Sequence, residues 1–249
     1  LYPAPSGYLP IELINNTTLP DKDVYLVVKA LNFATGRDCF IRINKETGIG
    51  RCEEVISGQT NPTEFNYPLS LLPKAENETK RLLYLPKVAS GRIYFSLKYP
   101  MDLFISPVSK RIVDPDGFKP RDSNYYLLYD KIEFTFNDGG SWINPTAVDF
   151  FSLPIHLYQS GATSEVKEAG LLGLRSRVIS KIKNIFNTFD TTNNKIWNRL
   201  FLNYAHDPNT TLRVSSPGKA MIDMIPGTNP FDPDYLSNPG VYGFDYATF

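Results

Sequence analysis

Short apolar segments alternate with clusters of turn residues over the first part of the chain. Apolar positions alternate with polar ones, or form short runs, at residues 24–28, 93–97 and 132–136. Pro, Gly, Asn and Asp clusters separate these segments, which is typical of short β-strands joined by turns. We therefore expect a mainly β protein in which residues 1 to about 157 form a β-barrel or β-sandwich.

The hydrophobic pattern changes near residues 159–161, and a helical spacing follows. Between Ser164 and about Phe189 the apolar positions lie on one side of a helix and the basic residues lie largely on the other. The apolar positions are Leu174, Val178, Ile182, Ile185, Phe186 and Phe189, and the basic ones are Arg175, Arg177, Lys181 and Lys183. Such a helix can lie on a membrane, but we favour packing of the apolar stripe on the helix's own domain. We predict a domain of residues 1–158 and a smaller one of residues 159–249.

A second short helix is predicted after the first. It begins near Asn194, a residue suited to the N-cap, and it carries the apolar residues between 196 and 201. The tail from Pro217 contains Pro-Gly pairs with Tyr and Phe between them. We interpret this tail as an ordered loop.

Composition excludes several classes of function. The 249 residues carry 26 basic and 26 acidic side chains, so the chain offers no field for a nucleic acid. No apolar run approaches the roughly 20 residues that span a bilayer, so we expect no membrane partner. Two histidines and two cysteines make no spaced ligand set, so we expect no metal and no other cofactor. Cys39 and Cys52 form either a disulfide, as in a secreted protein, or two free thiols.

The densest group of candidate functional residues lies between Tyr129 and Phe150. In a strand, Glu133, Thr135 and Asn137 share one face, while the Ile and Phe residues between them share the other. The apolar face points inward, so the polar face meets solvent or a ligand. The run Asn-Asp-Gly-Gly-Ser that follows has strong turn chemistry and predicts a hairpin.

The hairpin predicts which residues lie together on the polar face. A turn centred on Gly139 and Gly140 would set Asn137 opposite Trp142, Thr135 opposite Asn144, and Glu133 near Thr146. Pro145 cannot donate to a strand ladder, so the return strand should bulge or break there. A bulge would bring Asp149 to the face of Glu133 and turn Val148 and Phe150 towards the core.

Two carboxylates beside an aromatic ring, amides and hydroxyls suit a sugar polymer. Glycoside hydrolysis needs one carboxyl group to protonate the leaving oxygen and another to activate water or to attack the anomeric carbon. A diagonal offset on adjacent strands favours the gap of roughly 6.5 to 9.5 Å that inverting enzymes use. The Trp142 ring can cover pyranose C–H groups, while Thr and Asn bind hydroxyls. The alternative is a solvated sheet face whose two acids are unrelated.

These residues resemble glycoside hydrolase family 64, the β-1,3-glucanases that release short laminarin oligosaccharides. The resemblance is carried by residues 130–137, by Trp142, Asn144 and Thr146, and by residues 148–150 leading into 153–155. Residues 91–96 before this region, and residues 212–214 and 216–220 after it, also resemble family segments.

The resemblance implies an inverting mechanism with Glu133 as the general acid and Asp149 as the general base. It implies glucan contacts from Thr135, Asn137, Trp142 and Thr146, and Asn144 joins them as a candidate on the same face. It also implies a thaumatin-like β-barrel or sandwich domain joined to a smaller α/β domain, with an open groove between them. The expected partner is β-1,3-glucan, as laminarin or cell-wall glucan.

A second hypothesis is a glucan-binding protein of thaumatin-like architecture that does not hydrolyse its ligand. Binding would use the same groove and Trp142, but it would not need both acids. Because family members typically extend past the end of this chain, we expect a short or rearranged α/β part. Under either hypothesis we expect a secreted, monomeric protein.

Overall fold

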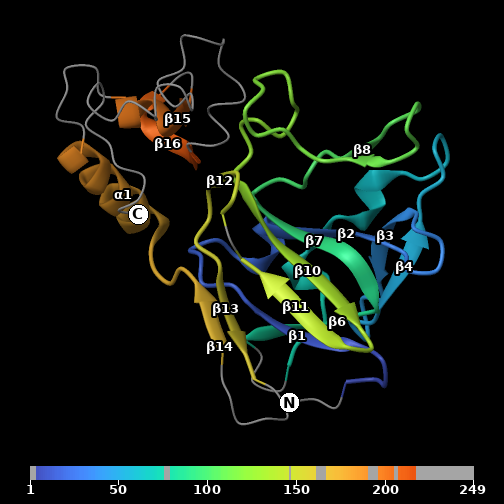
Figure 1. Ribbon diagram of the computed structural model, residues 1–249. Coiled ribbons are helices and arrows are strands. Elements are labelled where there is room, and N and C mark those ends of the chain that lie inside the picture. Colours follow the sequence, from blue (N-terminus) through green and yellow to red (C-terminus); the bar gives the residue numbers. More distant parts are fainter. Residues whose placement is uncertain are drawn as a thin grey trace. The chain divides into compact units, whose positions relative to one another are not determined.

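The computed structural model describes residues 4–75, 79–145, 147–160, 167–189, 196–204 and 207–216. Its contacts divide the chain into two compact units, Leu1–Asn144 and Pro145–Phe249. Strands are the main element of the described residues, so the expected mainly β class is confirmed (Figure 1). The domain boundary predicted between residues 158 and 159 stays a prediction, and the tail from Pro217 lies outside the described residues.

The elements of the two units are as follows. The strands of the first unit are β1 (Leu9–Ile14), β2 (Val24–Leu31), β3 (Asp38–Ile43), β4 (Gly50–Glu54), β5 (Tyr67–Pro68), β6 (Lys80–Leu85), β7 (Val88–Leu97), β8 (Phe104–Ile105), β9 (Ile112–Val113), β10 (Tyr129–Asn137) and β11 (Gly140–Asn144). Its 3₁₀ helices are η1 (Asp21–Asp23), η2 (Pro62–Phe65) and η3 (Leu69–Leu71). The second unit contains β12 (Phe150–Phe151), β13 (His156–Gln159), β14 (Lys167–Gly170), α1 (Arg175–Phe189), η4 (Ile196–Leu200), β15 (Phe201–Tyr204) and β16 (Asp207–Ser215).

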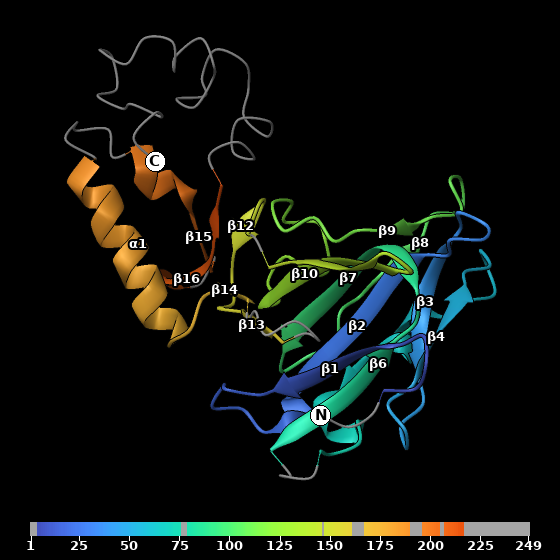
Figure 2. The same cartoon turned by 60° about the horizontal axis from the view of Figure 1, so that its bottom comes forward.

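The largest described sheet belongs to the first unit and has the strand order β11-β10-β7-β2-β3-β4, with β5 also paired to β2. Its strand pairs are antiparallel, and Figure 2 shows the β1–β6 pair crossing it. In β2, the consecutive residues Leu26, Val27 and Val28 are at most 1% exposed, so both faces of this central strand are covered. The strands of the candidate hairpin, β10 and β11, form one edge of this sheet.

The two cysteines are joined. Cys39 of β3 and Cys52 of β4 form a disulfide with a Cα–Cα distance of 5.5 Å, and Cys39 is fully buried. This result decides between the two alternatives that the sequence left open. The bond closes a short hairpin at the sheet edge opposite the candidate site.

The second unit has an apolar core of its own. Side chains of α1 pack against the buried side chains of β12, β15, β16 and η4. The helix contributes Val178, Ile179, Ile182 and Phe186, and the buried partners are Phe151, Trp197, Leu200, Phe201 and Val214. The interpretation of the amphipathic stripe as a packing surface is therefore confirmed. In the part of the chain that the structure describes, no helix is long and apolar enough to cross a membrane.

The predicted first helix was too long at its N-terminal end. Residues Lys167–Gly170 form β14, which pairs with His156–Gln159, and α1 begins only at Arg175. Gly170 and Gly173 have φ angles of +94° and +132°, which a right-handed helix does not allow. The backbone therefore turns before the helix begins.

The contacts and exposure of some residues in this region differ from those that the helical pattern predicted. Arg175 does not lie on a solvated face: its Nε donates to the Ser152 carbonyl at 2.6 Å and its Nη2 to the Leu212 carbonyl at 2.7 Å. Leu174 and Ile185, expected in the apolar stripe, are 56% and 47% exposed. A periodic pattern predicts which face of a helix is apolar. The packing of the neighbouring strands determines how many residues of that face are buried.

The second predicted helix ends earlier than expected. Residues Ile196–Leu200 form the 3₁₀ helix η4, and Phe201 already belongs to β15. Trp197 and Leu200 are buried, while the start predicted near Asn194 lies outside the described residues.

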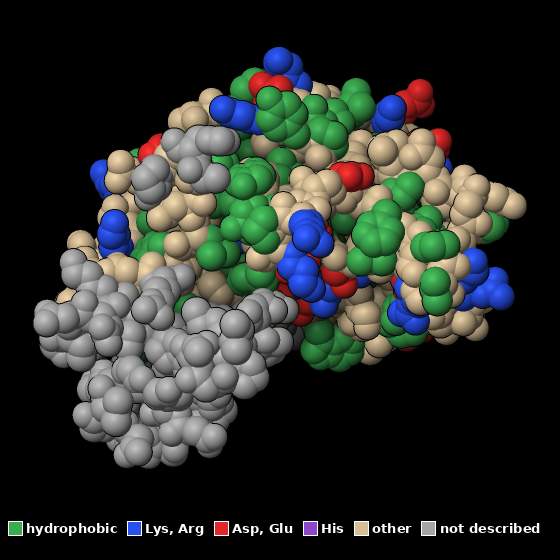
Figure 3. Space-filling model, turned by 90° about the horizontal axis from the view of Figure 1, so that it is seen from above, with side chains coloured by type: hydrophobic (Ala, Val, Ile, Leu, Met, Phe, Trp, Pro, Cys, Tyr) green, Lys and Arg blue, Asp and Glu red, His purple; other side chains and the backbone are tan. Residues whose placement is uncertain are grey.

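Basic and acidic side chains are interspersed among the described residues of the face in Figure 3, in keeping with their equal numbers.

Candidate functional site

The predicted hairpin exists, but its turn lies one residue earlier than expected. Asn137 pairs with Gly140, so Asp138 and Gly139 form the turn. The Oδ1 atom of Asn137 accepts a hydrogen bond from the Gly139 N–H at 2.7 Å, which is the contact of an Asx turn. Gly140, with a φ of +128°, then begins the return strand. The side chain of Asn137 therefore decides where the chain reverses.

This turn moves every cross-strand partner by two positions from the predicted register. Thr135 lies opposite Trp142, and Glu133 lies opposite Asn144. The predicted pairs of Asn137 with Trp142 and of Thr135 with Asn144 were therefore wrong. Because side chains alternate with a period of two, a two-residue shift leaves the same residues on the same face.

Exposure follows the predicted alternation over residues 132–135 of β10, whereas Phe136, expected to point inward, is half-buried. Ile132 and Phe134 are 6% and 4% exposed, whereas Glu133, Thr135 and Asn137 are only half-buried. On the neighbouring strand the Trp142 ring is 56% exposed and Asn144 is exposed as well. The strand ends at Asn144, so the predicted break at Pro145 is confirmed. The first unit therefore presents Glu133, Thr135, Asn137, Trp142 and Asn144 on one accessible face.

Thr135 has a local structural contact. Its Oγ1 accepts a hydrogen bond from the Ser90 N–H at 3.2 Å, next to a register irregularity between Phe134 and Phe136. Ser90 has a φ of +48°, in the left-handed region, so the β7 backbone departs from regular strand geometry at this contact. The hydroxyl accepts there and keeps its own proton to donate to a ligand.

The Glu133 carboxylate lies within a group of charged side chains that the sequence did not predict. Arg92 of β7, directly opposite in the register, donates from Nε to Glu133 Oε1 at 3.0 Å. The Lys131 Nζ lies 3.7 Å from the same oxygen. Arg92 also donates from Nη1 to Asp114 Oδ2 at 2.5 Å. The guanidinium of Arg92 thus links the two carboxylates.

Asp114 is the centre of the other half of this group. It accepts a hydrogen bond from the Tyr94 hydroxyl at 2.6 Å and lies 2.5 Å from Lys29 Nζ. Burial opposes ionisation, yet the hydrogen bond and charge of Lys29, with further help from Tyr94 and Arg92, hold the pKa of Asp114 below its ordinary value. Burial and the neighbouring Asp114 charge raise the pKa of Tyr94. Asp114 is therefore a lasting negative charge beside Arg92.

Asp149 belongs to the second unit and directly precedes β12. Its backbone carbonyl accepts a hydrogen bond from the Ser216 N–H at 2.8 Å, and the residue is half-buried. Phe150 is 7% exposed, as predicted, but Val148 is 63% exposed and does not face the core. The reason is that β12 begins only at Phe150, so strand alternation does not extend to Val148. Thr146 lies outside the described residues, and the separation of Glu133 from Asp149 stays a prediction.

Sequence reasoning missed Arg92, Asp114 and Lys29. Arg92 lies within residues 91–96, one of the segments that carried the family resemblance, which was the one available signal. These residues come from β2, from β7 and from the loop after β9, so only the pairing of the strands brings them to Glu133. Within the described residues, no group of three or more His, Cys, Asp or Glu side chains could hold a metal ion.

Comparison with known proteins confirms the resemblance that these residues suggested. The family model for the β-1,3-glucanases of glycoside hydrolase family 64 matches residues 7–237. The chain belongs to this family. Family 64 membership thus covers both units and includes both Glu133 and Asp149.

The curated relatives of this family 64 chain are longer proteins. Glucan endo-1,3-beta-glucosidases of Cellulosimicrobium cellulans and of Arthrobacter sp. (strain YCWD3) are each 39% identical to it over 88 residues. That match covers 35% of this chain and 16% of each relative. The chain therefore spans a small part of these two enzymes.

Solved structures of family 64 share the fold over most of the chain. A laminaripentaose-producing β-1,3-glucanase in complex with laminaritetraose has a TM-score of 0.67 at 22% identity, covering 87% of this chain and 54% of that one. A β-1,3-glucanase domain from Clostridium beijerinckii has a TM-score of 0.65 at 16% identity, covering 97% and 63%. At these identities the likeness shows the fold alone.

Proposed function

We propose that this family 64 chain hydrolyses β-1,3-glucan by an inverting mechanism, with Glu133 as the general acid and Asp149 as the general base. The observation that carries the proposal is the half-buried Glu133 on an accessible strand face beside an exposed Trp142. Two similar solved β-1,3-glucanases were crystallised with laminaritetraose and laminarihexaose, which supports β-1,3-glucan as the substrate class.

The two carboxyl groups have complementary tasks in this mechanism. Glu133 gives its proton to the leaving glycosidic oxygen as the bond from that oxygen to the anomeric carbon breaks. Asp149 takes a proton from a water molecule, whose oxygen attacks the anomeric carbon from the opposite side. A gap of roughly 6.5 to 9.5 Å between the two acids leaves room for this water. The β-linkage then yields an α-configured product.

The remaining residues of the face bind the glucan. The Trp142 ring covers the apolar C–H face of a sugar, while Thr135 and Asn137 exchange hydrogen bonds with its hydroxyls. Asn144 extends this polar surface along the return strand, and Thr146 is a further candidate glucan contact. The glucan lies in an open groove between a thaumatin-like β domain and the smaller α/β domain, and the protein acts as a secreted monomer.

Laminarin digestion tests the proposed function. Wild-type protein should release reducing sugar, and Glu133→Gln and Asp149→Asn should each lose that activity while still binding laminarin. Proton NMR of the first products should show the α anomer before mutarotation. Glucan binding without product at any pH would instead identify a non-hydrolytic β-glucan-binding protein, and a β anomer would exclude Asp149 as the base.

A further inference from the structure

The two oxygens of the Glu133 carboxyl group have different surroundings. Arg92 Nε donates to Oε1 at 3.0 Å, and Lys131 Nζ approaches the same Oε1 at 3.7 Å. Among the residues that the structure describes, none donates a hydrogen bond to Oε2. The Glu133 side chain is 39% exposed, so solvent and ligands can reach it. One oxygen is held by the protein and the other is available.

Arg92 is itself held in a fixed orientation. Its Nη1 donates to Asp114 Oδ2 at 2.5 Å, so the guanidinium is bound through two different nitrogens. Lys29 and Tyr94 in turn hold Asp114, through contacts of 2.5 Å and 2.6 Å. Lys29, Arg92 and Glu133 are directly paired neighbours on β2, β7 and β10. The contact with Glu133 therefore belongs to a rigid group and does not depend on one mobile surface side chain.

We propose that Arg92 is a positioning residue that fixes Oε1 of Glu133 and leaves Oε2 to carry and deliver the catalytic proton. The inference rests on the proposed function, in which Glu133 is the general acid. In the step itself, the O–H bond at Oε2 breaks, a new O–H bond forms on the leaving glycosidic oxygen, and Glu133 becomes a carboxylate. Its new negative charge lies beside the guanidinium, which stabilises the charge as it develops.

Asp114 has a defined part in this arrangement. Without it, the positive charge of Arg92 would have only Glu133 as a carboxylate neighbour. Asp114 offsets part of that charge at a contact of 2.5 Å and keeps the guanidinium oriented. Lys29 and Lys131 are the other charged groups that face this pair.

The test compares two leaving groups in the Arg92→Gln variant. Laminarin needs a proton on its leaving oxygen, whereas a 2,4-dinitrophenyl β-laminarioside releases a stable anion without one. We expect kcat on laminarin to fall about 10- to 100-fold, a part of the roughly 10²- to 10⁴-fold that a general acid supplies. KM should change little, and kcat on the dinitrophenyl substrate should stay near wild type. Arg92→Lys, which keeps the charge, should recover part of the loss on laminarin.

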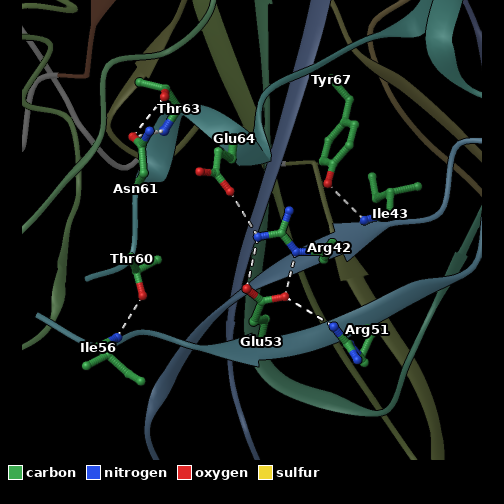
Figure 4. Close-up of polar contacts among 10 residues, drawn as sticks. All are labelled: Arg42, Ile43, Arg51, Glu53, Ile56, Thr60, Asn61, Thr63, Glu64 and Tyr67. Atoms are coloured by element: carbon green, nitrogen blue, oxygen red, sulfur yellow. Dashed lines mark hydrogen bonds and ion pairs between the residues drawn. The ribbon is translucent and has the colours of Figure 1, made fainter.

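Arg42→Gln is the matched control. Arg42 of β3 makes an ion pair of the same kind with Glu53 of β4, with contacts of 2.6 Å and 2.9 Å, and a further contact of 3.3 Å to Glu64 (Figure 4). These strands form the opposite edge of the same sheet from the hairpin. The control removes an equivalent cross-strand arginine, so it should leave the activity ratio between the two substrates unchanged.

A second measurement tests the role of Arg92 independently of enzyme activity. Crystal structures of wild type and Arg92→Gln should show one Glu133 rotamer in the first and several in the second. An unchanged activity ratio in folded Arg92→Gln, or an unchanged Glu133 rotamer, would overturn the role of Arg92. Wild-type protein inactive on both substrates would refute the proposed function instead, and the rotamer comparison would still decide whether Arg92 positions Glu133.

Discussion

Replacing Gly91 by alanine is expected to destabilise the first unit, because the added methyl group has no room. Gly91 of β7 lies opposite Phe134 of β10, whose ring covers it. A Cβ atom at Gly91 would lie 2.3 Å from Cε1, 2.4 Å from Cζ and 2.8 Å from Cδ1 of that ring. Phe134 is only 4% exposed, so its ring cannot simply swing into solvent.

The size of the effect follows from two opposing contributions. Gly91 does not have a positive φ, so alanine alone would stabilise by about 0.4–1 kcal/mol through the unfolded chain. Overpacking a buried contact costs about 1–3 kcal/mol. We expect a net loss of about 1–2 kcal/mol in the free energy of unfolding. The strain acts on β10 one residue from Glu133, so activity on laminarin should fall as well.

Urea denaturation followed by tryptophan fluorescence measures this loss. A Trp197→Phe background leaves Trp142 as the reporter, so the signal comes from the first unit. Phe134→Leu removes the Cε1 and Cζ atoms, and Gly91→Ala should therefore cost much less in that background. An equal cost in both backgrounds, or a single-variant loss below about 0.5 kcal/mol, would refute the steric reasoning.

Three further predictions follow from the contacts described above. The Cys39→Ala/Cys52→Ala double variant should lose about 3 kcal/mol in the free energy of unfolding by urea, because a crosslink with a sequence separation of 13 restricts the unfolded chain. A loss near zero would contradict stabilisation through the unfolded chain. Asp114→Asn should lose about 1 kcal/mol at neutral pH, a figure discounted for a side chain that is 40% exposed. The pKa of Asp114 is lowered on folding, so this stabilisation is present above the unfolded pKa of about 3.9 and disappears as the pH falls through the folded pKa. The unfolding curves of wild type and Asp114→Asn should therefore converge in acid. A difference in the free energy of unfolding that stays constant with pH would contradict this role of Asp114. Trp142→Ala should weaken laminari-oligosaccharide binding in calorimetry by about 10-fold with little change in kcat, and a loss confined to kcat would contradict a binding role.

The local features of the candidate site could be predicted from the order of the residues. Alternation in β10 identified the face of Glu133, Thr135 and Asn137, and the turn residues identified the hairpin. These predictions succeed because strand alternation and turn chemistry act over a few neighbouring residues. The register failed because a single contact, from Asn137 Oδ1 to the Gly139 N–H, moved the turn by one residue.

In the helical region too, some features follow from neighbouring residues and others depend on residues farther along the chain. The apolar spacing located α1 and its packing side, yet helix-forming residues before Gly170 became β14 because His156–Gln159 was available to pair with them. A strand partner satisfies backbone hydrogen bonds that a short helix would satisfy only weakly. Intrinsic propensity did not decide that segment.

Some properties of this protein thus follow from neighbouring residues, and others exist only in the folded chain. The polar face and the alternation of buried and accessible positions in β10 could be derived before any coordinates, and so could the one possible disulfide pair. The contacts of Arg92 with Glu133 and Asp114 could not, because strand order and register bring together residues far apart along the chain. The charges around Glu133 are therefore a property of the assembled sheet, since Coulomb interactions depend on distance in space and not on position in the sequence.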